Sequence, residues 1–243
     1  QDIMFPVVGK PEKIYYPLEP SVEDLYDDTI EMLAPKPGQV GLTYNRYMAI
    51  MYLIPEKKQE YKSADVISAH LKAIMKTLLL KRLDSSFHAF EQSIKRFRDS
   101  TKMMIDMFDN GRIYIAPNLP VNEYLLDDRE DELIEKINAA KDTDPSIMEC
   151  EPAHFDQTFL PSLKEDYKLL MDLATRWGKV TEDSKFDEFL KQLRTEFIQE
   201  EKNPTGKMVI FSESKETTRY LAGKLADESI DRVLLIDGDS KAA

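Results

Sequence analysis

Hydrophobic residues recur at steps of three and four along most of this 243-residue chain, which is the spacing of one face of an α-helix. Prolines, glycines and clusters of capping residues separate the periodic segments. The pattern predicts helices over residues 21–33, 42–54, 63–109, 127–137, 160–176 and 183–200. The chain up to residue 205 is therefore predicted to be a helical bundle.

Residues 71–97 are both the most apolar and the most basic part of the chain. On a helix, one continuous apolar stripe would contain Ile74, Leu78 or Leu79, Leu83, Phe87, Phe90, Ile94 and Phe97. With Arg98, which directly follows this range, the opposite side has a net charge of +5, in a chain of net charge −12, from Lys72, Lys76, Lys81, Arg82, Lys95, Arg96 and Arg98 against Asp84 and Glu91. Two interpretations remain open. The basic side chains solvate a helix whose core they partly cover, or they bind an anionic partner.

Asp84, Ser85 and Ser86 interrupt this segment, because these residue types favour caps and turns over helix interiors. We therefore expect a kink there, or a break with a new helix that begins at Ser85 or Ser86. Further helix ends are expected at Ser21, at Ser63 or Asp65, and at Asn110 with Gly111.

The hydrophobic period changes after a turn at residues 203–206. Two continuous apolar runs of strand length, residues 208–211 and 233–236, flank a helix-like segment at residues 214–226. This order predicts a parallel βαβ unit whose strands are buried on both faces. So short a unit cannot cover both faces of its own sheet. The rest of its domain is therefore expected from the amino-terminal strand or from a longer protein, of which this chain, lacking an initiator Met, looks like a piece.

The predicted fold class is mainly α, with a helical bundle followed by a short C-terminal βαβ unit. We expect an extended segment at residues 1–19 with an edge strand at 13–18, a helical domain at 20–205, and a truncated α/β lobe at 206–243. A further short strand is predicted at residues 113–115, and residues 142–155 are expected to be irregular.

Composition excludes several classes of protein. No run approaches the roughly 20 apolar residues of a membrane helix, so no membrane partner is expected. A single cysteine, Cys150, excludes an intramolecular disulfide and indicates a reducing, cytoplasmic location. Three histidines make a multi-ligand zinc site unexpected. The acidic balance argues against a surface that binds nucleic acid throughout, while it allows a local basic track.

The best-placed candidate site is the junction between the apolar run 208–211 and the helix that follows it. Hydroxyls of Ser212, Ser214 and Thr217, the Lys215 ammonium and the free amides of a helix start can hold a phosphate oxygen. Alternatively, Ser212 or Ser214 simply caps the helix. The spacing leaves both interpretations open.

Nucleotide-binding and hydrolase signatures are missing from the sequence. Thr205, Gly206 and Lys207 resemble the end of a phosphate-binding loop, but Glu201 replaces its first glycine and Met208 its Ser or Thr. No Ser/His/Asp set or glycine-rich elbow appears. We therefore expect no catalytic residues, no metal site and no cofactor site in this chain alone.

Two segments resemble a known protein family. Residues 207–225 resemble motif IV, which opens the second RecA-like lobe of superfamily-two helicases. Residues 76–90 resemble a segment of bacterial Swi/Snf-type helicases, in which Leu-Lys-Arg precedes an acidic residue, two serines and an Ala-Phe pair. Residues 21–29 and 44–52 also resemble the helical region between the two lobes of that family.

The resemblance implies a piece of an ATP-dependent DNA helicase or translocase. ATP and Mg would bind between the lobes of the parent protein, through motifs outside these 243 residues, so this piece alone should be inactive. DNA and the remaining lobes would be its partners. The implied DNA backbone contacts are Ser212, Ser214, Lys215 and Thr217, with Lys81 and Arg82 coupling the lobes or tracking DNA.

Other interpretations come from different classes of protein. The main alternative is a noncatalytic helical interaction module whose basic face binds an acidic protein surface. A complete nucleotide-binding α/β enzyme would need phosphate chemistry that the sequence lacks.

Overall fold

The computed structural model describes residues 9–59, 64–115, 147–230 and 232–237, together with Tyr124, Arg129, Glu132, Glu135, Lys136 and Ala139. Most of the helix predicted at residues 127–137 lies outside the described residues, and so do Ser63 and the side chain of Asp65, where a cap was predicted.

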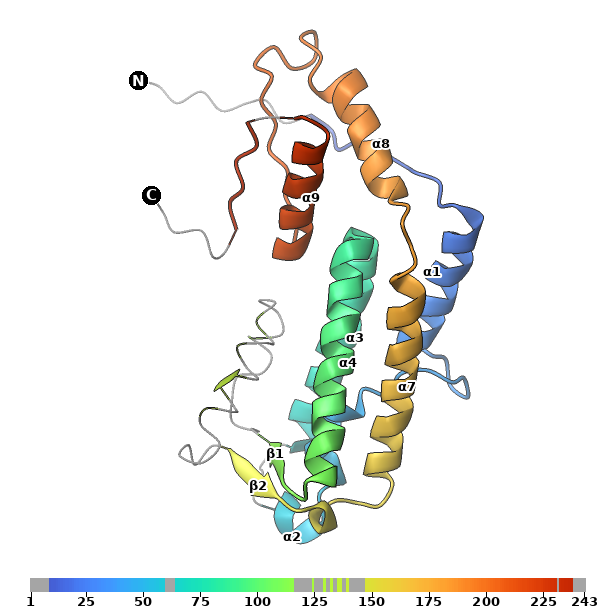
Figure 1. Cartoon of the computed structure of the whole chain (residues 1–243), viewed down its shortest axis with the longest axis vertical. Coiled ribbons are helices and arrows are strands. Elements are labelled where there is room, and N and C mark those ends of the chain that lie inside the picture. The colour runs from blue at the N-terminus through green and yellow to red at the C-terminus, as the bar shows by residue number, and fades with distance from the viewer. Residues whose placement is uncertain are drawn as a thin grey trace.

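The mainly helical fold class is confirmed. The α-helices are α1 (Pro20–Leu33), α2 (Pro55–Lys58), α3 (Ala64–Ser85), α4 (Phe87–Asp109), α7 (Phe159–Trp177), α8 (Ser184–Gln192) and α9 (Lys215–Asp227). A 3₁₀ helix (Asn45–Tyr52) precedes α2, another (Pro152–His154) precedes α7, and a π-helical turn (Leu193–Phe197) extends α8. Figure 1 shows α3, α4 and α7 along the long axis, with α8 and α9 at one end and two short strands at the other.

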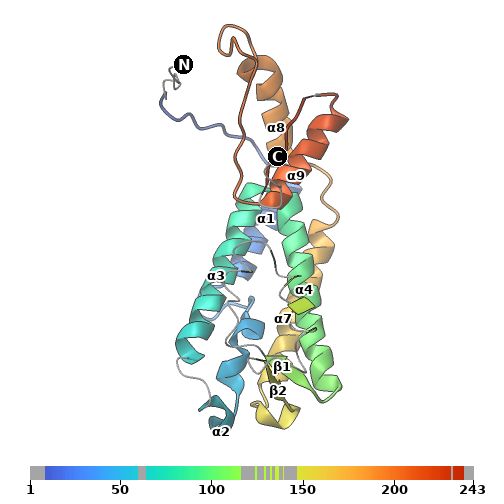
Figure 2. The same cartoon turned by 90° about the vertical axis from the view of Figure 1, so that its left-hand side faces the viewer.

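The predicted break at Asp84–Ser86 is confirmed, and it converts the central segment into a helical hairpin. Ser86 has extended backbone and its Oγ accepts a hydrogen bond from the Ala89 amide at 3.3 Å, so it caps α4. Helices α3 and α4 lie side by side (Figure 2). The apolar stripe of residues 71–97 is therefore split between two helices that bury it against each other. Its fully buried members are Leu79, Leu83, Phe90, Ile94 and Phe97.

The end of α4 also follows the prediction. Gly111 has a φ of +75°, a conformation that costs glycine little. The Arg112 amide donates to the Met107 carbonyl at 3.1 Å and the Gly111 amide to the Phe108 carbonyl at 3.1 Å. These two bonds form a Schellman cap, which turns the chain sharply into the first strand.

Trp177 lies at the centre of the first core, between α1, α3, α4 and α7. Its ring packs against Phe87 and Phe90, with ring centroids 5.0 and 5.3 Å away. Its indole N–H donates to Thr29 Oγ1 at 2.9 Å, and that hydroxyl donates to the Leu25 carbonyl at 2.6 Å. The indole N–H is thereby satisfied inside an apolar core.

Asp166 of α7 organises the loop before the first 3₁₀ helix. Its carboxylate accepts bonds from the Thr43 amide at 2.7 Å, the Thr43 hydroxyl at 2.9 Å and the Asn45 amide at 3.1 Å. These donors flank Tyr44, which adopts a left-handed φ of +60° that is uncommon outside glycine. In this conformation Tyr44 stacks on Phe97 and donates its hydroxyl to the Leu33 carbonyl at 2.7 Å.

A second core lies where the strands meet the bundle. Strand β1 (Ile113–Ile115), which was predicted, pairs antiparallel with β2 (Met148–Cys150), with Ile113 opposite Cys150. The expectation of irregular structure across residues 142–155 was wrong for β2, because Met148–Cys150 has a partner 35 residues earlier in the chain that local patterns do not reveal. Phe155 and Phe159 stack beside Phe108 to close this core.

Some predicted boundaries were wrong in detail. Helix α1 begins at Pro20, with Glu19 at the N-cap position in place of Ser21, since proline suits the first helical turn. The helix predicted at residues 42–54 is the shorter 3₁₀ helix Asn45–Tyr52. Residues 13–18 form no strand in the described part of the chain, and Tyr15 is 79% exposed, because no neighbouring strand pairs with them.

The helix of the predicted βαβ unit is confirmed as α9, but its two flanking strands are not formed. Residues 208–211 and 233–236 have no regular secondary structure, and Phe211 and Leu234 are 91% and 82% exposed. A strand of a parallel sheet needs backbone partners and cover on both faces, and the described residues provide neither for these runs. Leu225 of α9 packs instead against Phe186 and Leu193 of the α8 region. The RecA-like lobe therefore stays a prediction.

Candidate functional site

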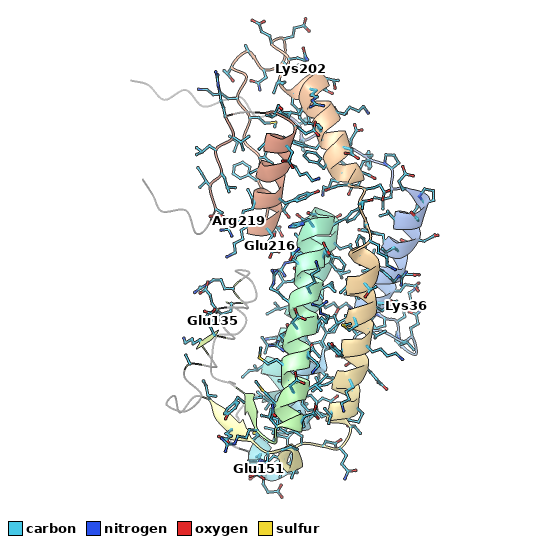
Figure 3. The ribbon with its side chains drawn as sticks, in the orientation of Figure 1. Lys36, Glu135, Glu151, Lys202, Glu216 and Arg219 are labelled. Atoms are coloured by element: carbon cyan, nitrogen blue, oxygen red, sulfur yellow. The ribbon has the colours of Figure 1, made fainter. Side chains whose placement is uncertain are left out.

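A cleft of about 500 Å³ opens where the tip of the α3–α4 hairpin meets α8, α9 and the segment before α9. Figure 3 shows Glu216 and Arg219 at the end of α9 that faces the hairpin. The lining residues are Lys81, Asp84, Ser85, Ser86, Asp183, Lys185, Phe186, Phe189, Ile210, Phe211, Ser212, Glu213, Thr217, Tyr220 and Leu221. The volume is typical of small-ligand sites.

Of the two serines at the start of α9, one caps the helix and the other lines the cleft. Ser214 is buried, and its Oγ accepts from the Thr217 amide, so this residue is the N-cap. Ser212 is exposed on the cleft, and its Oγ accepts from the Ser214 amide at 3.2 Å. A hydroxyl that accepts one bond still has a proton to donate. Ser212 and half-buried Thr217 thus remain candidates for an anion contact, and Lys215 lies half-buried at the first position of the helix.

Lys81 reaches the cleft from the last turns of α3. Its Nζ lies 2.9 Å from Glu213 Oε2, and the two side chains are 57% and 76% exposed. The ion pair joins the helical hairpin to the loop before α9, although 132 residues separate its members in the chain. Lys81, Ser212 and Thr217 therefore line the same cleft.

Arg82 points elsewhere, into the hairpin. The residue is 8% exposed, and its guanidinium donates to Ser93 Oγ on α4 at 2.7 Å. Ser93 also donates to the Ala89 carbonyl at 2.8 Å and accepts from Arg96 at 3.2 Å. Arg82 does not line the cleft. Its geometry fits a bond between two helices, which adjacency to Lys81 in the sequence does not reveal.

Four side-chain contacts hold α9 and α8 on the hairpin tip. Arg96 forms an ion pair with Glu216, whose side chains are 21% and 17% exposed. Ser85 Oγ lies 3.3 Å from Thr217 Oγ1, and the His88 ring stacks on Tyr220 with centroids 4.7 Å apart. The fourth contact, from Lys185 of α8, is a bond of 2.7 Å to the Asp84 carbonyl.

Tyr220 also binds Asp183, the N-cap of α8. Its hydroxyl donates to Asp183 Oδ2 at 2.8 Å, while Asp183 Oδ1 accepts from the Phe186 amide at 3.0 Å. Burial, together with the Asp183 carboxylate, raises the pKa of the Tyr220 hydroxyl well above its ordinary value. Tyr220 is therefore a permanent donor that ties α9 to α8.

The sequence pattern did not identify several of these residues as part of a site. Glu213, Tyr220, Asp183 and Lys185 line the cleft, and Glu216 anchors α9 beside it. Asp183 carried a usable signal, because an Asp three residues before Phe186 is a typical N-cap. Nothing local to the other positions indicated their partners, which lie on distant helices.

The cleft presents donors for an anion beside the carboxylates of Asp84, Asp183 and Glu213, and it contains no recognisable catalytic set. Hydroxyls and a lysine ammonium face the cleft, as phosphate contacts require. Within the described residues, no group of three or more His, Cys, Asp or Glu side chains is placed to hold a metal ion. Within the same residues, no helix has the length and apolar character needed to cross a membrane.

Comparisons with models of protein families, with curated proteins and with solved structures found no match to this chain.

Proposed function

We propose that this chain is part of a cytoplasmic, ATP-dependent DNA helicase or translocase of the bacterial Swi/Snf type. The proposal rests on the position of two segments that are far apart in the sequence. Residues 76–90 and 207–225, which each resemble that family, line the same cleft. Lys81 and Ser85 come from the first segment, and Ser212 and Thr217 from the second.

In this proposal, the cleft contacts the DNA backbone. The Lys81 ammonium, the Ser212 and Thr217 hydroxyls and the first turn of α9, with Lys215, suit phosphate oxygens. ATP and Mg would be held by other motifs of the parent protein. The contribution of this chain would be DNA contact and coupling, because the Arg96–Glu216 pair links α9 to the hairpin.

Salt-dependent DNA binding tests the proposal. Lys81→Ala and Lys215→Ala should each weaken binding of a fluorescently labelled duplex DNA. Each should also make the slope of log affinity against log salt less negative by about one unit, because one phosphate contact is lost. The matched control is Lys36→Ala, an exposed lysine away from the cleft (Figure 3). If the salt slope is the same for Lys81→Ala, Lys215→Ala and Lys36→Ala, the cleft is not part of the DNA interface.

One feature favours a second candidate function, a noncatalytic module that binds acidic protein surfaces. Lys81 and Arg96 on the hairpin already bind Glu213 and Glu216 of the α9 region. An acidic partner helix could make the same two contacts. If the chain binds no DNA at low salt but retains an acidic peptide through Lys81, this alternative replaces the helicase proposal.

A further inference from the structure

Two ion pairs join α9 and the loop before it to the hairpin, and they differ greatly in exposure. The Arg96–Glu216 side chains are 21% and 17% exposed, whereas those of Lys81 and Glu213 are 57% and 76% exposed. Exposed pairs between long side chains contribute little to stability, because water screens them and both side chains lose conformational freedom. The Lys81–Glu213 pair can therefore open while Arg96–Glu216 keeps α9 in place.

Glu213 also lies at the position where an anion would bind. It is next to Ser212, it faces the cleft with Thr217, and its carboxylate lies 2.9 Å from the Lys81 ammonium. A carboxylate and a phosphate present the same kind of oxygen to an ammonium group. A phosphate that used Lys81 from this side would have to displace the Glu213 carboxylate.

We infer that Glu213 is a built-in competitor for the phosphate site. Without DNA, Glu213 holds Lys81. When DNA binds, the Lys81 ammonium moves to a phosphate oxygen and the Glu213 carboxylate turns to solvent. The inference rests on the proposed function, since it names how that site is kept closed until a polyanion arrives.

Removing the competitor should strengthen DNA binding. Glu213→Gln keeps the shape of the side chain but removes its charge, so affinity for labelled duplex DNA should rise about two- to fivefold at low salt. The gain should shrink as salt rises, because both contacts are electrostatic. The matched control is Glu228→Gln, which removes the same charge from an exposed pair with Arg194 at 2.9 Å, at the other end of α9. That variant should bind DNA as the parent does.

Combining Glu213→Gln with Lys81→Ala separates competition from general repulsion. In the Lys81→Ala background there is no ammonium to release, so Glu213→Gln should gain no more than Glu228→Gln does. A gain that persists without Lys81, or an absent gain in the single Glu213→Gln variant, would overturn the inference while Lys81→Ala still reports DNA contact. If Lys81→Ala and Lys215→Ala leave DNA binding unchanged, the proposed function fails, and the inference fails with it.

Discussion

Replacing Asp166 with alanine is expected to lower the free energy of unfolding by about 2–4 kcal/mol, because backbone amides lose a buried carboxylate acceptor. Asp166 is 1% exposed and accepts from the Thr43 and Asn45 amides, while Asn45 is itself 4% exposed. The same bonds hold Tyr44 in its left-handed conformation against Phe97. Loss of the carboxylate therefore leaves three donors without this acceptor, and it removes the bonds that hold Tyr44 in place against Phe97.

Urea unfolding followed by circular dichroism measures this loss. Asp172→Ala is the control, since Asp172 lies on the same helix with a 52% exposed side chain. It should change stability by less than about 0.5 kcal/mol. A loss at Asp166 no larger than that at Asp172 would show that the amides find other acceptors.

The contribution of Asp166 should also depend on pH. Burial raises the pKa of its carboxyl group despite the bonds from Thr43 and Asn45. Between the unfolded pKa and this higher folded pKa, the folded state binds more protons than the unfolded state, so the contribution falls as the pH rises through that window. As the pH increases, the parent should therefore lose stability relative to Asp166→Asn. A stability difference that stays constant across acid pH would contradict the raised pKa of Asp166.

Replacing Arg82 with alanine should destabilise the protein by about 2 kcal/mol, because a nearly buried guanidinium leaves its partner across the hairpin. Arg82 bonds Ser93 at 2.7 Å, and this contact joins α3 to α4. Arg82→Met retains much of the apolar stem but not the guanidinium, so it should recover only part of the loss. Thermal unfolding of the two variants measures both effects.

Lys81→Ala is the matched control for Arg82, since the two residues are neighbours on one helix. Lys81 is mostly exposed, and its removal should change stability by less than about 0.5 kcal/mol while weakening DNA binding. Arg82→Met should instead lower stability and leave DNA binding unchanged. If Arg82→Met makes the salt slope less steep, as Lys81→Ala should, then Arg82 contacts DNA, as the family resemblance implied.

The sequence correctly predicted helix ends that depend only on a residue and its near neighbours. Ser86 ends one helix and caps the next, and Gly111 closes α4, because both depend on the conformational preference of a residue and its near neighbours. The strand Met148–Cys150 was missed because its partner lies at Ile113–Ile115. Apolar content predicted a strand at residues 208–211, and that prediction was wrong, because content alone provides no neighbouring strand.

The candidate site was predicted in part. Ser212, Thr217 and Lys81 were named from the sequence, and they share a cleft. The roles of Arg82 and Glu213 depend on which way side chains point from a helix or loop. Adjacent residues on a helix face directions about 100° apart, so Lys81 can reach solvent while Arg82 enters the hairpin.

The chain contains a single tryptophan, and its position makes it a natural optical probe. Trp177 is 2% exposed between Phe87 and Phe90, and its indole is bonded to Thr29. Fluorescence emission from this ring therefore reports on the core between α1, α3, α4 and α7. Opening of the core should shift the emission to longer wavelength, whereas a change confined to the end of α9 should leave the spectrum as it was.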